Sequence, residues 1–168
     1  MLELISTAGR GNYTLVEESR DVAQLKYKNW LSSTAIVSID DRVIEIKPKN
    51  IWHSKNIISI DGTKVGTIRT NWKGHIIIER QHEDTTKRWT LKNKGFMKYV
   101  FKLYDEQNDV VLTLESAMNW KKLSYQYRIE LLDTGYDIDF IKELVIYCGY
   151  GINMHLNMIA AGSFGAAG

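Results

Sequence analysis

The sequence predicts a mainly β domain, a closed barrel of about twelve antiparallel strands around one central, hydrophobic C-terminal α-helix. Three observations lead to this prediction. Short segments with alternating polar and apolar residues recur along residues 1–132, as in strands with one buried and one solvated face. Turn-forming residues separate these segments. Residues 144–161 then carry apolar side chains on every side of a helix, and such a helix must be surrounded by other apolar groups.

Polar and apolar side chains alternate along each predicted strand, and turns separate one strand from the next. In the segment Met97–Tyr104, for example, Phe101 and Leu103 share one face and Lys98 and Lys102 the other. We expect strands near Leu2–Thr7, Tyr13–Glu17, Val22–Tyr27, Thr34–Ile39, Arg42–Lys47, Asn56–Ile60, Lys64–Thr70, His75–Gln81, Lys87–Lys92, Met97–Tyr104, Val110–Ser116 and Ser124–Leu132. No Pro-, Gly- or Ser-rich linker interrupts them, so residues 1–168 form a single domain. So many short strands must hide their edges, either by closing into a barrel or by forming a two-sheet sandwich.

A helix is expected over about residues 138–161, with Asp137 or Asp139 as its N-cap. A bilayer, a helical bundle or the inside of a closed sheet would surround it, and the absence of another strong helix pattern excludes the bundle. A bilayer span needs ~20 apolar residues, whereas Gly149, Gly151 and Asn153 interrupt this stretch. The barrel interior explains the mixture better, since small residues allow close strand approach. A tail anchor remains the alternative.

Charge is unevenly distributed along the chain. Residues 42–102 hold 14 basic and 5 acidic side chains, a balance of +9, against −2 over residues 1–41 and −5 over residues 103–168. One interpretation is that lysines and arginines simply solvate the outer strand faces. The other is a basic surface for an anionic partner, either lipid headgroups or nucleic acid.

The dipeptide Asn-Trp occurs three times, ending at Trp30, Trp72 and Trp120. Equivalent positions at strand ends would place these tryptophans around a barrel rim, where they either close the core or meet a membrane interface. Lysines follow two of them, as an anionic membrane favours. The candidate lipid- or partner-binding residues are therefore Trp72, Lys73, Trp120, Lys121 and Lys122.

Signals for catalysis or for a metal are poor. The four histidines form no HxH or HExxH motif, and the lone cysteine, Cys148, is too far along a helix from His155 for a dyad. We expect no enzyme activity, no cofactor and no metal, and no small-molecule ligand in a lumen that the helix fills. No nucleic-acid-binding motif is present. With no signal peptide visible at the start, we expect a cytoplasmic protein at the periphery of a membrane.

The element order resembles a known fold. Twelve strands followed by a hydrophobic helix, with hairpin segments such as Ile60–Gly66 and Leu103–Asp105, resemble the tubby C-terminal-like superfamily of tubby proteins, phospholipid scramblases and LURP-one-related proteins. The chain is nearer in length to the LURP-one-related members. It lacks a scramblase-type cysteine cluster and a calcium loop, so scramblase activity is not implied.

The resemblance implies a twelve-stranded barrel closed around its C-terminal helix. Together with the basic segment, it predicts a non-enzymatic domain that binds an anionic membrane lipid, such as a phosphoinositide, or a membrane-associated protein. The alternatives are a purely structural or protein-interaction domain and, if the helix lies in lipid, a tail-anchored protein.

Overall fold

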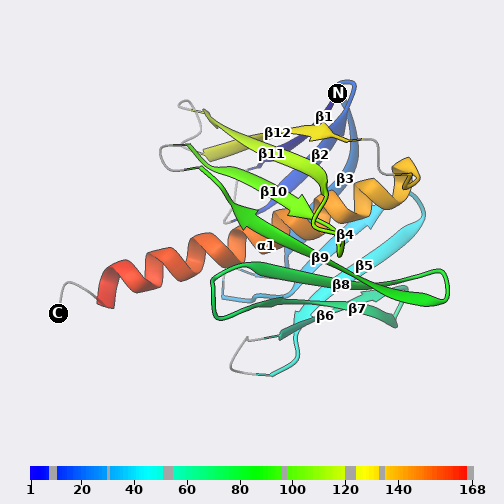
Figure 1. The fold of residues 1–168 in the computed structure, drawn as a ribbon, viewed down its shortest axis with the longest axis horizontal. Helices are drawn as coiled ribbons and strands as arrows, with labels where there is room; N and C mark the ends of the chain where they lie inside the picture. Colours follow the sequence, from blue (N-terminus) through cyan, green and yellow to red (C-terminus); the bar gives the residue numbers. More distant parts are fainter. Residues whose placement is uncertain are drawn as a thin grey trace.

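The computed structural model of the chain describes residues 1–7, 11–29, 31–50, 55–95, 98–119, 124–132 and 135–165. Their strands form one closed antiparallel barrel, and a single long helix runs through it (Figure 1). The strands are β1 (Leu2–Ser6), β2 (Tyr13–Glu17), β3 (Arg20–Tyr27), β4 (Ala35–Ile39), β5 (Arg42–Pro48), β6 (Lys55–Ile60), β7 (Thr63–Thr70), β8 (Ile76–His82), β9 (Thr85–Asn93), β10 (Val100–Tyr104), β11 (Val110–Asn119) and β12 (Ser124–Leu131). The helix is α1 (Ile138–Gly165).

Each strand pairs with its neighbours in sequence, and β1 pairs with β12 to close the barrel. The closing pair aligns Leu2 with Ile129 and Leu4 with Tyr127. Closure leaves the sheet no unpaired edge, so the predicted barrel is confirmed and the sandwich alternative is wrong. Two strand bounds differ by three residues. β11 continues to Asn119 rather than Ser116 because Asn119 still pairs with Ser124 of β12. β10 begins at Val100 rather than Met97, which lies outside the described residues.

The central helix is also confirmed, but it continues to Gly165 rather than Ala161, and residues 157–161, which we expected inside the barrel, are exposed because the helix is longer than the barrel. Asp137 caps it, since its Oδ1 accepts a hydrogen bond of 2.9 Å from the Phe140 amide. From Phe140 to Asn153 almost every side chain is buried. The inward residues of the strands, Leu4 and Ile46 among them, are fully buried against it. At about 1.5–3 kcal/mol for each buried large apolar side chain, this helix is a main part of the core.

Two glycines let the helix run close to the barrel wall. A Cβ added at Gly149 would lie 2.8 Å from Leu4 Cδ2, and one at Gly151 would lie 2.8 Å from Ile76 Cγ2. Real Cβ atoms need more room than this, so a larger side chain at either position would require the Leu4 or Ile76 side chain to move. The glycines that interrupt the apolar stretch are therefore packing residues.

The helix also buries one carboxylate near its start. Glu143 is 3% exposed, and its oxygens lie 2.5 Å from Arg42 Nη1 and 3.3 Å from Arg80 Nη2. The Tyr147 hydroxyl donates a third hydrogen bond of 3.1 Å. Burial and the nearby Glu143 charge raise the pKa of Tyr147, so this tyrosine stays protonated as a donor. The cluster ties α1 to β5 and β8.

We expect Gly66→Ala to lower the free energy of unfolding by about 1–3 kcal/mol. A Cβ at this position in β7 would lie 2.2 Å from the Glu79 carbonyl oxygen of β8, a backbone atom that cannot move without breaking the ladder. Urea unfolding followed by circular dichroism measures the change. Gly162→Ala is the control, because a Cβ there meets nothing within 4 Å. Equal stability of the two variants would contradict the prediction, because it would show that β8 does not restrict the side chain at position 66.

Candidate functional site

Antiparallel pairing divides the connections between two ends of the barrel. The helix starts after β12 at the end formed by the connections that follow the even-numbered strands, which we call the entry end. It leaves at the end formed by the connections that follow the odd-numbered strands, the exit end. Hydrogen bonds mark both positions: Glu143 meets Arg42 at the start of β5, and Asn153 Nδ2 donates to the Gly11 carbonyl oxygen between β1 and β2.

The two ends carry opposite charge. Among the described residues of the exit-end connections no side chain is acidic, and five are lysines: Lys28, Lys49, Lys73, Lys94 and Lys98. In the described part of the entry-end connections no side chain is Lys or Arg, and ten are carboxylates: Glu18, Asp40, Asp41, Asp61, Glu83, Asp84, Asp105, Glu106, Asp109 and Asp137. The barrel is therefore polarised along the helix, basic where the helix leaves it.

Much of the basic charge on the strands is neutralised locally. Glu45 lies 3.2 Å from Lys28 Nζ and 3.1 Å from Lys47 Nζ, and these contacts lower the pKa of its carboxyl group. Glu79 pairs with Arg88 at 2.8 Å. At the exit end Lys98 pairs with Glu115 at 2.8 Å. Within the described ranges Lys49, Lys73 and Lys94 make no ion pair, so these three leave their charge available to a partner.

The predicted site residues Trp72 and Lys73 lie together on the β7–β8 turn of the exit end. Trp72 is 89% exposed, and Lys73 Nζ lies 5.0 Å from the centroid of its ring. Asn71 Oδ1 accepts hydrogen bonds of 3.0 Å from the amides of Lys73 and His75, which fixes the turn. Trp72 therefore does not close the core, and the turn presents its indole to the surroundings. The other predicted residues, Trp120, Lys121 and Lys122, lie outside the described residues, between the paired ends of β11 and β12.

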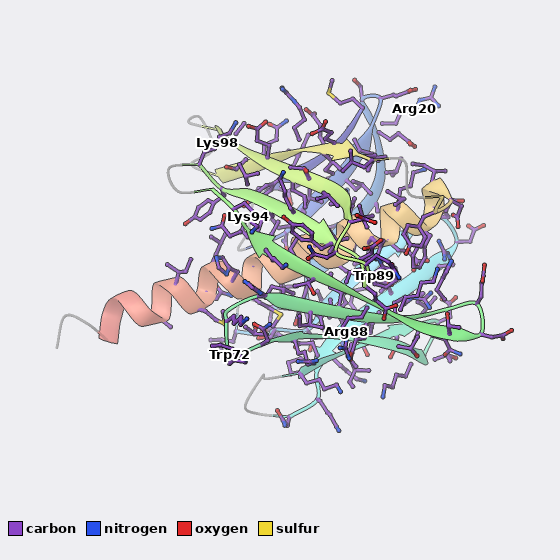
Figure 2. The ribbon with its side chains drawn as sticks, viewed as in Figure 1. Arg20, Trp72, Arg88, Trp89, Lys94 and Lys98 are labelled. Atoms are coloured by element: carbon purple, nitrogen blue, oxygen red, sulfur yellow. The ribbon has the colours of Figure 1, made fainter. Side chains whose placement is uncertain are left out.

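The structure adds residues that the sequence did not single out. The pKa of His75 is lowered by burial and by the positive charges of Lys92, Lys73 and Lys94. These three lysines therefore lie near His75. Lys92 Nζ lies 4.3 Å and Lys94 Nζ 5.9 Å from the ring centroid of Tyr104. Figure 2 shows Trp72, Lys94 and Lys98 on the side where the helix leaves the barrel, and Arg20 on the opposite side.

The helix continues beyond the barrel at this basic end (Figure 1). Met158 is 41% and Ile159 is 44% exposed, and no Asp, Glu, Lys or Arg follows Glu143 in the sequence. His155, at the exit, lies near the backbone of Gly74, and its pKa is lowered mainly by burial. The emerging helix therefore passes beside the Trp72 turn, and the apolar helix end and the exposed indole lie at the same end of the barrel.

Residues Ile138–Gly162 of α1 are long and apolar enough to cross a membrane by length and composition alone, and more than half of the most apolar stretch is buried inside the barrel. The buried residues cannot contact lipid while the barrel is closed. The remaining part, Met154–Gly165, is about 18 Å long at ~1.5 Å per residue, shorter than the ~30 Å hydrocarbon core. In the folded protein, α1 can therefore enter a bilayer only partway.

Other reactive groups are enclosed. Cys148 is fully buried, and burial raises the pKa of its thiol. In the part of the chain that the structure describes, no three His, Cys, Asp or Glu side chains are placed to hold a metal ion. The exit end is thus the most distinctive surface of the described molecule.

In comparisons with known proteins, no family model, no curated protein and no solved structure matches this chain. The resemblance to the tubby C-terminal-like superfamily therefore stays a prediction, based on element order and hairpin sequences.

Proposed function

We propose that the protein is a non-enzymatic, peripheral membrane-binding domain of the tubby-like kind, which attaches to anionic lipid through the exit end of its barrel. The proposal rests on one observation: the apolar helix leaves the barrel at the end whose connections carry lysines and no carboxylates among the described residues. An anionic membrane attracts lysines and excludes carboxylates from its surface, and an interfacial helix buries apolar residues below the headgroups.

The exposed side chains match the layers of such a membrane. Met158 and Ile159 lie on the part of the helix that emerges from the barrel and would enter the acyl region. Trp72 would lie at headgroup depth, which indole rings prefer. Lys73 and Lys94 would face the lipid phosphates. The ten carboxylates of the entry end would point away, which orients the barrel with its helix toward the bilayer.

Charge reversal at the exit end should weaken binding to anionic vesicles by at least about 30-fold, since each lysine at such a surface contributes about 1 kcal/mol. The test variant is Lys73→Glu with Lys94→Glu, measured by co-sedimentation with vesicles of phosphatidylcholine and phosphatidylserine. The matched control is Arg20→Glu with Lys64→Glu, two exposed residues at the entry-end ends of β3 and β7. Each double variant lowers the net charge by 4, from +2 to −2.

The control variant should keep most of its binding, and raising the salt concentration should release the unmodified protein, because screening acts within about 8 Å at physiological ionic strength. If both double variants lost binding equally, net charge rather than the exit end would be responsible. If the unmodified protein bound neutral and anionic vesicles equally, or neither, the proposal would be wrong, and the second result would favour a protein partner.

A further inference from the structure

A pocket opens at the exit end, between the emerging helix and the connection from β3 to β4. Its volume is about 600 Å³, within the ~300–1,000 Å³ of small-molecule sites. It lies at the mouth of the barrel, beyond the part of the lumen that α1 fills. Its position places it beside the surface that we propose to meet the membrane.

The floor of the pocket is fixed by hydrogen bonds. The Tyr150 hydroxyl donates to the Ser33 carbonyl oxygen at 2.7 Å and lies 3.0 Å from Asn56 Oδ1. Asn153 Nδ2 donates to the Tyr27 hydroxyl at 3.1 Å. The rings of Tyr27 and Tyr150 stack with their centroids 5.9 Å apart. These contacts preorganise the floor, so a ligand would find it already formed.

The walls hold polar groups whose hydrogen-bonding capacity is only partly used. Asn29 Oδ1 accepts from the Leu31 amide, and Ser32 Oγ accepts from the Thr34 amide. These bonds orient both side chains and leave the Asn29 amide N–H groups and the Ser32 hydroxyl hydrogen without a partner among the described residues. The side chains of Ser33 and Asn157 also line the pocket and have no hydrogen bond to another described residue. Donors and acceptors therefore occur together around the cavity.

The chemistry of the lining selects the ligand class. None of the lining side chains carries a charge, so the pocket offers neither the cations that hold a phosphate nor the carboxylates that hold a metal. Amides and hydroxyls both donate and accept, as the hydroxyl groups of a sugar do. Leu31, Met154 and Leu156 supply apolar contact for the C–H faces of a ring. This mixture suits an uncharged, polyhydroxylated ring.

We propose that this pocket binds an uncharged hexose ring, presented by the headgroup of a neutral glycolipid. The choice of a lipid as the source rests on the proposed membrane-binding function, whereas the choice of a ring rests on the pocket alone. The lysines would attract the protein to an anionic surface, and the pocket would select a particular lipid within it.

Two measurements test the proposal separately from the lysines. Saturation-transfer NMR with methyl glucoside probes the free ring in the absence of a membrane. Co-sedimentation with phosphatidylcholine vesicles, with and without glucosyl diacylglycerol, probes the lipid. The test variant is Ser33→Val with Asn157→Leu, and the matched control is Ser38→Val with Gln107→Leu, which likewise replaces one hydroxyl and one side-chain amide by apolar groups, at exposed residues away from the pocket.

We expect saturation transfer from the unmodified protein and the control, and at least about tenfold stronger binding to the glycolipid vesicles than to phosphatidylcholine alone. The test variant should lose both effects yet keep its binding to phosphatidylserine vesicles. Transfer to the free glucoside without a preference for glycolipid would support the pocket and assign its ligand to soluble sugars. No transfer and no preference would overturn the inference, even if binding to anionic vesicles persisted.

Discussion

A chain that ends at Asp137 is expected to show no cooperative unfolding transition. The inward side chains of the strands, such as Leu25 and Val37, are fully buried against α1. Without the helix they would surround a space that they are too short to fill, and cavities of that size cost more than the ~5–15 kcal/mol by which a domain is stable. Thermal melts by circular dichroism and binding of a hydrophobic dye would show an unfolded or molten chain.

A second truncation separates the core from the emerging part of the helix. A chain that ends at Asn157 keeps the buried residues of α1 and removes the segment that begins with the exposed residues Met158 and Ile159. It should melt cooperatively near the temperature of the full chain and bind vesicles less well. A cooperative melt of the chain that ends at Asp137 would show that the barrel does not need the helix as its core.

Glu143→Ala is expected to lower the free energy of unfolding by about 3–5 kcal/mol, the usual loss when one partner of a buried ion pair is removed. The substitution would leave Arg80, only 14% exposed, beside Arg42 with no carboxylate between them. It would also remove the hydrogen-bond acceptor of Tyr147. Urea unfolding monitored by fluorescence measures the difference.

Surface ion pairs supply the control for this prediction. Glu115→Ala removes the partner of Lys98, but both side chains are about half exposed, and such solvent-screened pairs contribute little to stability. Replacing Glu143, Arg42 and Arg80 together by methionine should recover part of the stability lost in Glu143→Ala, because no unpaired charge remains. If Glu143→Ala were no worse than Glu115→Ala, the buried cluster would not contribute to folding.

The fold could be predicted because its signals are local. Alternation identifies a strand such as β10, and Asp61 with Gly62 forms a turn in which both residues have positive φ, 48° and 82°. The all-round apolar pattern of residues 144–161 predicted a helix inside the sheet, which holds as far as Asn153, whereas residues 157–161 are exposed. The three-part Glu143 cluster was not predicted, since Arg42 and Arg80 are separated from it by 101 and 63 residues, and no local pattern links them.

The candidate site was predicted only in part. Trp72 and Lys73 were found because they are adjacent in the sequence. Counting charge over consecutive thirds of the chain hid the separation of lysines and carboxylates between the two ends of the barrel. An antiparallel barrel places every second connection at the same end, so this separation is not visible along the sequence. Counting charge by alternate connections would have separated lysines from carboxylates. The pocket could not be predicted, since Asn29 and Asn157 meet only after the chain has closed.

The position of the core helix in the chain also sets the order of folding events. Synthesis runs from the N-terminus, so all twelve strands emerge from the ribosome before the helix around which they pack. At roughly 5–20 residues per second, the 28 residues of α1 take about 1.5–6 s to appear. Through that interval the inward faces of the strands are complete but have nothing to cover them. Closure between Leu2 and Ile129 joins segments far apart in the chain, a slow step for any β protein. The emergence of α1 therefore controls when this barrel can fold, and until then the nascent strands depend on chaperones to keep their uncovered apolar faces from aggregating.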